Sequence, residues 1–185
     1  MAEVQFAPQG GVNASDPNVS DCGGSLKQVK AMTLEEQATN FTTMRHIERV
    51  RNLLNMVIRD LLERAEKHDQ SKLETPEVET FTEFTKKLAT CTYGSPEYQS
   101  FLAAMKPALD HHYARNSHHP EHYPEGVNDM NLLDLIEMFC DWKAAGERHN
   151  DGNILKSIEK NTDRFGISPQ LARVFRNTAK LFDGE

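Results

Sequence analysis

Apolar residues recur along most of this chain at steps of three and four positions, which is the spacing of one face of an α-helix. Thr33 and Glu36 have the spacing of a capping box, so a long first helix is expected to begin near Thr33. Alternating runs of β-branched residues, the pattern of strands, are absent from the sequence. The sequence therefore predicts an all-α fold. The first helix is predicted to carry a buried stripe made of Met44, Ile47, Val50, Leu54, Val57 and Leu61.

Proline and short polar residues divide the rest of the chain into further helices. Pro76 is expected at the first position of a second helix, and Ser95-Pro96 opens a third. Pro107 lies within the third helix and is expected to bend or split it. The remaining predicted elements are a loop over 116–128, a helix capped by Asp129 or Asn131, a short helix over 152–162 and a last helix from Ser168-Pro169.

The length of 185 residues is typical of one domain. Residues 1–32 are rich in Gly, Asn, Ser, Asp and Pro and show no apolar period. They are predicted to form a flexible tail, with packing on a partner subunit as the alternative. Residues 33–185 are predicted to form the helical domain.

Composition and charge narrow the class of protein. The net charge of −7 disfavours binding to duplex nucleic acid, which requires a basic surface. No apolar run reaches the roughly 18 residues of a membrane-spanning helix, and the first residues lack the apolar core of a signal peptide. We therefore expect a cytoplasmic protein, located in the host cytoplasm if the gene is a phage gene. The three cysteines contain no CxxC pair, so they predict neither a disulfide framework nor a thiolate zinc site.

Side chains that can bind metals are concentrated in a few short segments. Seven of the eight histidines fall in two short clusters or on one helix leading to them. Neutral imidazoles and carboxylates that arrive from several helix ends form the donor set of a transition-metal site. The segments are His46, then His68-Asp69 with Lys72, then His111-His112, then His118, His119, Glu121 and His122, and finally Asp134, Glu137 and Asp141.

The helical phase indicates which of these side chains point inward. Asp134, Glu137 and Asp141 share one face of a helix that is apolar almost all round, so they are expected to be largely buried. Buried carboxylates are costly unless they meet a cation or hydrogen-bond donors. His112 continues an apolar stripe, whereas His111 points about 100° away, although either can be the ligand. The alternatives are a core histidine with ordinary partners and a solvated charged face.

The order of these residues resembles the HD-domain superfamily of metal-dependent phosphohydrolases. His68-Asp69-x-x-Lys72 together with the segment HHPEHYPEG, residues 118–126, is similar to an abbreviated form of the HD-GYP motifs. The segment 42–177 also resembles an uncharacterised all-helical family from phage and bacterial genomes that shares HDxSK, HHPEHY and EMxxDWxA. The resemblance implies a compact HD-like helical bundle.

The superfamily resemblance also implies roles for single residues. One metal site would consist of His46, His68, Asp69 and Asp141, with Asp69 as the bridge to a second site. The second site would consist of His112, His118 and His119. The catalytic residues would be Asp69, Lys72 and Glu121, with Lys72 facing the scissile phosphate. Glu121 or His122 would either protonate the leaving oxygen or hold His118 and His119 in position. Asp134 and Glu137 would orient ligand histidines.

The function implied is a metal-dependent phosphohydrolase acting on a nucleotide or a related small phosphate ester, as a nucleotidase or a cyclic-nucleotide phosphodiesterase. The cofactor would be one or two divalent ions of Mn, Fe, Ni, Zn or Mg, which lower the pKa of a bound water and polarise a phosphoryl oxygen. Two alternatives remain at this point: an HD-like di-iron oxygenase and a non-enzymatic binding module that contains a metal. The expected partners are a small phosphorylated substrate and, in a homodimer, a second copy of the chain.

Overall fold

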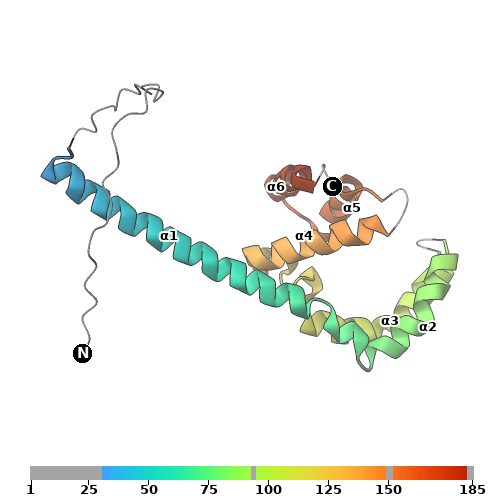
Figure 1. Cartoon of the computed structure of the whole chain (residues 1–185). Helices are drawn as coiled ribbons and strands as arrows, with labels where there is room; N and C mark the ends of the chain where they lie inside the picture. The colour runs from blue at the N-terminus through green and yellow to red at the C-terminus, as the bar shows by residue number, and fades with distance from the viewer. Residues whose placement is uncertain (1–30, 93–94, 149–151, 183–185) are drawn as a thin grey trace, which may run out of the picture. The chain divides into compact units, whose positions relative to one another are not determined.

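The structure is a computed structural model that describes residues 31–92, 95–148 and 152–182. Within these ranges every regular element is helical, which confirms the all-α prediction (Figure 1). Residues 1–30, almost the whole of the predicted tail, lie outside the described residues. The α-helices are α1 (Leu34–Lys67), α2 (Glu77–Thr90), α3 (Pro96–Arg115), α4 (Leu132–Glu147), α5 (Ile154–Phe165) and α6 (Pro169–Ala179). Short 3-10 helices are η1 (Gln70–Leu73), η2 (Pro120–His122), η3 (Gly126–Asp129) and η4 (Lys180–Phe182).

The chain divides into two units, Met1–Met44 and Arg45–Glu185, with the boundary inside α1. In the described part of the first unit, the backbone N–H of Thr33 donates to Glu36 Oε2 at 2.7 Å, and the N–H of Glu36 donates to Thr33 Oγ1 at 3.2 Å. This reciprocal pair is the predicted capping box, and it satisfies two amide groups that the first turn of a helix leaves without partners. The helix therefore begins where the sequence indicates.

Most of the other helix starts also follow the predicted capping residues. Ser95 and Ser168 each accept a backbone N–H at the start of their helix, and Asn131 forms a full capping box with Asp134. The second helix differs by one position. Pro76 follows a cis peptide bond and is the residue before α2, so the first helical residue is Glu77.

The largest apolar core of the second unit joins α4, α5 and α6. Phe139 stacks on Phe175 with ring centroids 5.9 Å apart, and Ile158 is fully buried beside them. The same core fixes α4, because Met138 and Phe139 face inward. The carboxylates on the other side of α4 are therefore held on a rigid element. The buried core residues are Met130, Met138, Phe139, Ile158, Ile167, Ala172, Phe175 and Ala179.

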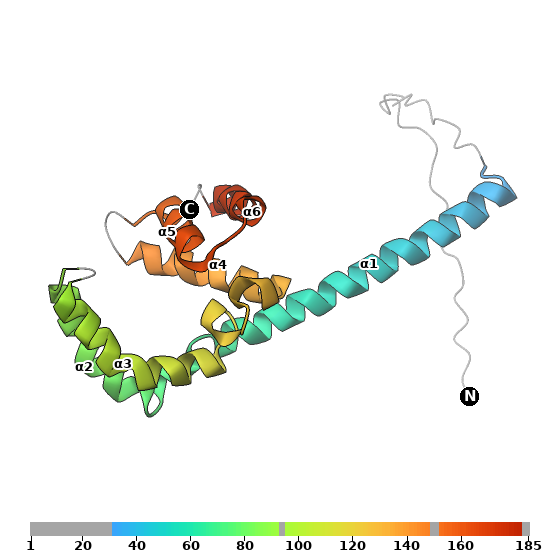
Figure 2. The same cartoon turned by 180° about the vertical axis from the view of Figure 1, so that it is seen from behind.

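Helices α2 and α3 form a second packed pair, and α3 bends part-way along its length (Figure 2). Pro107 lies inside α3 and removes one backbone hydrogen bond, so the bend has the predicted cause. Beyond Pro107, Ala108 and His112 are buried. The last two turns of α3 thus carry histidine toward the interior of the unit.

The prediction that the stripe on α1 is buried is wrong for the single chain. No residue of α1 is buried, and Ile47, Leu54 and Val57 keep 49%, 57% and 39% of their surface exposed. The periodicity correctly predicts a helix, but it cannot say whether the covering surface belongs to the same chain.

Of the helices in the described ranges, none combines the length and the apolar character that a membrane crossing demands.

Candidate metal centre

The first site segment follows directly on the last turn of α1. His68 comes immediately after Lys67, and Asp69 has φ 56° and ψ 11°, a left-handed conformation that ends the helix and precedes η1. Aspartate adopts this conformation more readily than most residues, because its short polar side chain can bond locally. The turn directs the side chains of His68 and Asp69 toward the end of α3 and toward α4.

The other imidazoles come from α3 and from the segment that follows it. His112 lies in the last turn of α3 and is 2% exposed, and His118, just before η2, is 1% exposed. His119 caps η2, and its ring lies 4.1 Å from the ring of His118 and 4.8 Å from that of His112. Of the adjacent pair in α3, His112 is the residue that points into the cluster, as its apolar phase indicates.

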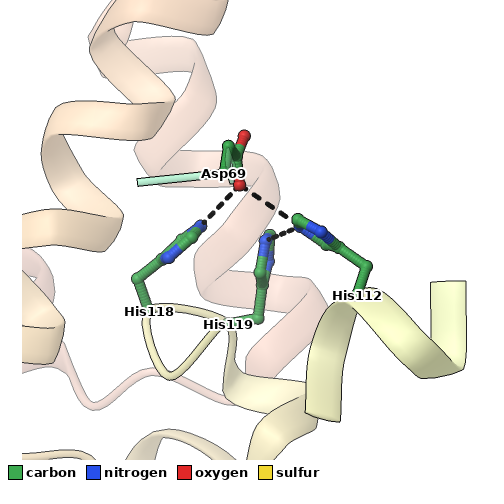
Figure 3. A group of neighbouring side chains, drawn as sticks. All are labelled: Asp69, His112, His118 and His119. Carbon is green, nitrogen blue, oxygen red and sulfur yellow. Dashed lines mark hydrogen bonds and ion pairs between the residues drawn. The ribbon is translucent and has the colours of Figure 1, made fainter. Parts of the chain in front are cut away.

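Four side chains converge with their ligand atoms within 4.8 Å of one another: Asp69, His112, His118 and His119 (Figure 3). Asp69 Oδ1 lies 3.3 Å from His112 Nε2 and 3.5 Å from His118 Nε2, and the Nε2 atoms of His112 and His119 are 2.9 Å apart. Ligand atoms at 2.0–2.2 Å from one tetrahedral ion lie about 3.3 Å apart. The two separations from Asp69 match that value. We call these four residues the three-histidine group.

Asp69 also belongs to a second group with His68 and Asp141. His68 Nε2 lies 3.6 Å from Asp69 Oδ2 and 3.8 Å from Asp141 Oδ1. Asp69 thus presents one carboxylate oxygen to each group, which is the arrangement expected of a bridging carboxylate. Apart from His46, each predicted ligand lies in the group to which the sequence assigns it.

Two polar atoms at the centre support the presence of a cation. Asp69 Oδ1 and His118 Nε2 are buried, face each other, and make no hydrogen bond with any described residue. Nδ1 of His118 lies 3.1 Å from Glu137 Oε1, so the proton of a neutral ring belongs on Nδ1 and Nε2 carries a lone pair. Two facing lone pairs repel each other, and buried unpaired polar atoms cost about 1–3 kcal/mol each. A bound metal ion would satisfy both atoms.

Two glutamates fix the tautomers of the ligand imidazoles. Glu137 Oε1 lies 2.9 Å from Nδ1 of His68 and 3.1 Å from Nδ1 of His118. Fully buried Glu77 accepts from Nδ1 of His112 at 2.9 Å and from Nδ1 of His111 at 2.7 Å. With the proton on Nδ1, the Nε2 atoms of His68, His112 and His118 are available to bind a metal. Such carboxylate partners orient a ligand histidine and raise its basicity.

Asp134 is linked to the ligand histidines through Arg64 and Glu137. It is completely buried and accepts from Arg64 at 2.7 Å, Ser117 at 2.8 Å and the Tyr123 hydroxyl at 2.7 Å. Arg64 also donates to Glu137 Oε2 at 3.2 Å. The expectation that the buried acids of this helix meet a cation and donors is confirmed. Glu137 lies within hydrogen-bond distance of two ligand histidines, as expected of a residue that orients them, whereas Asp134 bonds to Arg64 and to the loop after α3.

The two groups shift the pKa values of their histidines in opposite directions. Hydrogen bonds with the carboxylates of Asp141 and Glu137 raise the pKa of His68 to about 10, so this position favours positive charge. Burial lowers the pKa of His119 to about 3, helped by the neighbouring His118 and His112, so its ring is neutral at physiological pH. Burial also lowers the pKa of His112. The neutral rings of His112 and His119 have the protonation state that a metal ion requires of an imidazole ligand.

Two predicted residues have other surroundings than expected, and a third lies at the cluster. His46 is exposed and does not join the cluster, because it lies on the same straight helix as Lys67 and is separated from it by roughly 30 Å of helix. Glu121 accepts from Arg164 at 2.7 Å, and among the described residues no hydrogen bond joins it to a ligand histidine, so its role at the site stays a prediction. Lys72 lies at the cluster and donates to Asp69 Oδ2 at 2.6 Å.

The surroundings of Glu121 lead to a first prediction. Glu121→Ala is expected to leave the metal content unchanged and to change the free energy of unfolding by no more than about 1 kcal/mol, because it loses an ion pair with Arg164, which is 59% exposed. Metal analysis and urea unfolding would measure both. Loss of metal from this variant would restore Glu121 to the site.

Glu77 and Arg64 are site residues that the sequence did not predict. Glu77 follows a proline at the start of a helix, where an acidic residue is explained by the helix dipole alone. Arg64 stands in the last turn of α1, where a basic residue is equally ordinary. A possible signal was the helical phase of Arg64, since it falls on the apolar stripe seven residues after Val57.

The structure defines an all-α protein in which the ends of α1 and α3 meet α4 at a cluster of imidazoles and carboxylates. Residues 35–181 match the model of a family described as a family of unknown function, DUF5662. The match covers most of the chain, and the protein therefore belongs to that family. Comparison with curated proteins and with solved structures returned no match.

Proposed function

We propose that this protein is a metal-dependent phosphohydrolase that acts on a small phosphate ester, with nucleotides as the preferred class. The observation that carries the proposal is Asp69, whose two carboxylate oxygens face two separate groups of ligand atoms. Paired metal sites that share a carboxylate are typical of enzymes that displace oxygen groups at phosphorus.

The residues present suit two divalent ions. His112, His118 and His119 would hold one ion with Asp69, and His68 and Asp141 would hold the other with Asp69. A donor set of imidazole and carboxylate, without thiolate, suits Mn, Fe, Ni or Zn. When bound, such ions supply Lewis-acid polarisation of a phosphoryl oxygen and acidify water.

The protein's own residues supply position and charge. Glu77 and Glu137 keep the proton of the ligand imidazoles on Nδ1. Lys72 carries its ammonium group beside Asp69 and is 38% exposed, so it can contact an anion that approaches the shared carboxylate. In this position it would offset negative charge that develops on the phosphoryl oxygens.

The exposure of the group formed by His68 and Asp141 favours a catalytic metal over a purely structural one. His68 and Asp141 keep 29% and 24% of their side-chain surface exposed, whereas His112 and His118 are almost completely buried. A structural site is closed by protein ligands, and a catalytic site leaves a position open. The His68 side of the centre is accessible to a small substrate.

The test begins with metal content. Protein purified without chelator is expected to hold about two metal ions per chain by mass spectrometry. The loaded protein should then hydrolyse p-nitrophenyl phosphate or its diester and, faster, at least one nucleotide. A protein that takes up no metal, or a fully loaded protein inactive on all of these esters, would refute the proposal. Iron uptake coupled to oxygen consumption would assign the centre to an oxygenase instead.

Lys72 provides a sharper test of the phosphate position. Lys72→Ala is expected to retain its metal and to lower kcat about 100-fold, because the charge opposite the transition state is lost. Lys67→Ala is the matched control, since Lys67 is 79% exposed and forms an ion pair with Glu63 in the same helix. Equal turnover of the two variants would show that Lys72 serves only to neutralise Asp69.

A further inference from the structure

The middle of α1 carries more exposed apolar surface than a single chain explains. Between residues 47 and 62, eight aliphatic or methionine side chains keep 39–62% of their surface exposed. Summed over all faces of the helix, they expose on the order of 700 Å² of apolar surface per chain, more than scattered single side chains account for. They are Ile47, Val50, Leu53, Leu54, Met56, Val57, Ile58 and Leu62.

Part of this surface has the spacing of a helix-pairing seam. Ile47, Val50, Leu54, Val57 and Leu61 follow one another at steps of three, four, three and four. This is the alternation of the two apolar positions in a coiled-coil heptad. We call these five residues the α1 seam. A seam of this kind covers itself by pairing with an equivalent helix.

The α1 seam runs directly into an apolar groove between α1 and α4. The groove encloses about 460 Å³. Its apolar lining is Leu61 and Ala65 from α1 and Ile136, Cys140 and Ala144 from α4. At its polar end lie His68 and Asp141. Leu61 belongs to both surfaces, so one continuous apolar strip extends from Ile47 to the metal cluster.

We propose that the α1 seam and the α1–α4 groove form one self-complementary surface, on which α1 of a second copy of this chain packs in antiparallel orientation. The shapes of the two halves of this surface are complementary. The exposed side chains in the N-terminal half of the seam can fill the groove at the end of its C-terminal half. A two-fold axis that places Leu54 opposite Val57 of the partner subunit fits each ridge into the other groove. One surface used twice is the commonest form of protein dimer.

The parallel orientation is disfavoured, because α4 already covers the C-terminal end of α1. Arg64 and His68 continue the seam by the same spacing, and both are bound by α4 through Asp134 and Glu137. In a parallel pair the two copies of α4 would meet at the same end of the seam and compete for one space. In the antiparallel pair they lie at opposite ends.

The antiparallel pairing also gives His46 a position near the cluster. With Leu54 opposite Val57 of the partner subunit, residue 46 of one copy lies opposite residue 65 of the other. His68 is three residues further on, about 4.5 Å along the helix axis, and packed helices lie 8–10 Å apart. His46 of the partner subunit would then lie at the polar end of the groove, beside His68 and Asp141. We infer that it adds a nitrogen ligand to that group; this step rests on the proposed metal centre.

Two substitutions with matched exposure test the dimer. Leu54 and Met56 are 57% and 54% exposed in the chain, but only Leu54 lies in the α1 seam. The wild type is expected to have twice the 21.0 kDa mass of one chain by light scattering at micromolar concentration. Leu54→Glu should give a monomer with unchanged helical content, and Met56→Glu should remain a dimer.

Other masses would overturn the proposal. A wild type that is monomeric, or a dimer that both variants retain, would show that a second copy does not cover the seam. Equal dissociation of both variants would place the contact elsewhere on α1. A different protein that co-purifies in place of the second copy, and is lost only in Leu54→Glu, would assign the seam to a partner of another kind.

Mixed dimers test the position of His46 separately, with metal content as the readout. His46→Ala and Asp69→Asn should each lose metal from the His68 group as pure dimers. After exchange of subunits, half of the mixed dimers' sites regain both His46 and Asp69, because the two residues come from different chains. Recovery of metal supports ligation across the dimer. Full metal content in the pure His46→Ala dimer, or no recovery in the mixture, would overturn it without affecting the dimer itself.

Discussion

Replacing Asp69 with asparagine is expected to weaken metal binding at both groups at once, by about 100-fold or more, while the helices stay folded. The reason is that one carboxylate faces His112 and His118 through Oδ1 and His68 through Oδ2. Asparagine keeps the size of the side chain and tolerates the left-handed backbone at this position. The change thus keeps the shape of the side chain but removes the negative charge and replaces one of its two oxygens by a nitrogen that cannot bind a metal. Metal content and competition with a chelator would measure the loss.

Two comparisons make this result specific. Asp69→Ala should lose metal equally and should also lose roughly 1–2 kcal/mol of stability, because alanine is strained at positive φ. Asp110→Asn removes a carboxylate from the exposed face of α3, where it bonds to Lys106, and should retain all its metal. If Asp69→Asn kept both ions, the bridging assignment would be wrong.

Replacing Glu77 with alanine is expected to destabilise the metal-free protein by about 3–5 kcal/mol. Glu77 is completely buried and accepts hydrogen bonds from His111, His112 and Ser71. Its removal takes away the carboxylate that accepts from all three, and a buried polar network that loses its charged member is costly. Urea unfolding followed by circular dichroism would measure the change. Glu79→Ala, on the exposed side of the same helical turn, should have a small effect.

The conservative variant separates stability from ligand orientation. The amide of Glu77→Gln has one accepting oxygen and one donating nitrogen, so it cannot accept from His111 and His112 together. Where the nitrogen faces His112, that ring must accept at Nδ1 and carry its proton on Nε2, the atom that faces Asp69. Metal affinity should fall 10–100-fold although the fold persists. Nitrogen chemical shifts of His112 would report the tautomer, and an unchanged affinity would show that Glu77 is only structural.

Much of the cluster could be predicted because its members lie on regular elements with a definite phase. Asp134, Glu137 and Asp141 follow one another at steps of three and four residues on α4, so their common face follows from the helical repeat. His112 continues the apolar positions of α3 and is buried as expected. Periodicity is a local property, and local properties can be inferred from one sequence.

What could not be predicted depends on which elements meet. The burial of Glu77 results from the packing of α2 against α3, which no spacing within α2 indicates. The same holds for His46: its phase is compatible with an inward position, but a straight helix separates it from His68 in the same chain. Glu121 was assigned by its closeness to His119 in the sequence, whereas its side chain bonds to Arg164 of α5.

The ligands are spread widely along the sequence, and this affects when the metal centre forms during folding. His68 and Asp141 belong to segments that are far apart in the sequence, and most of the second unit must be in place before they meet. Closing long loops costs entropy that only later contacts recover, so the cluster assembles late in folding. In the unfolded chain, the neighbouring His118, His119 and His122 offer only a weak local chelate. Strong metal binding is therefore expected only after the chain has folded.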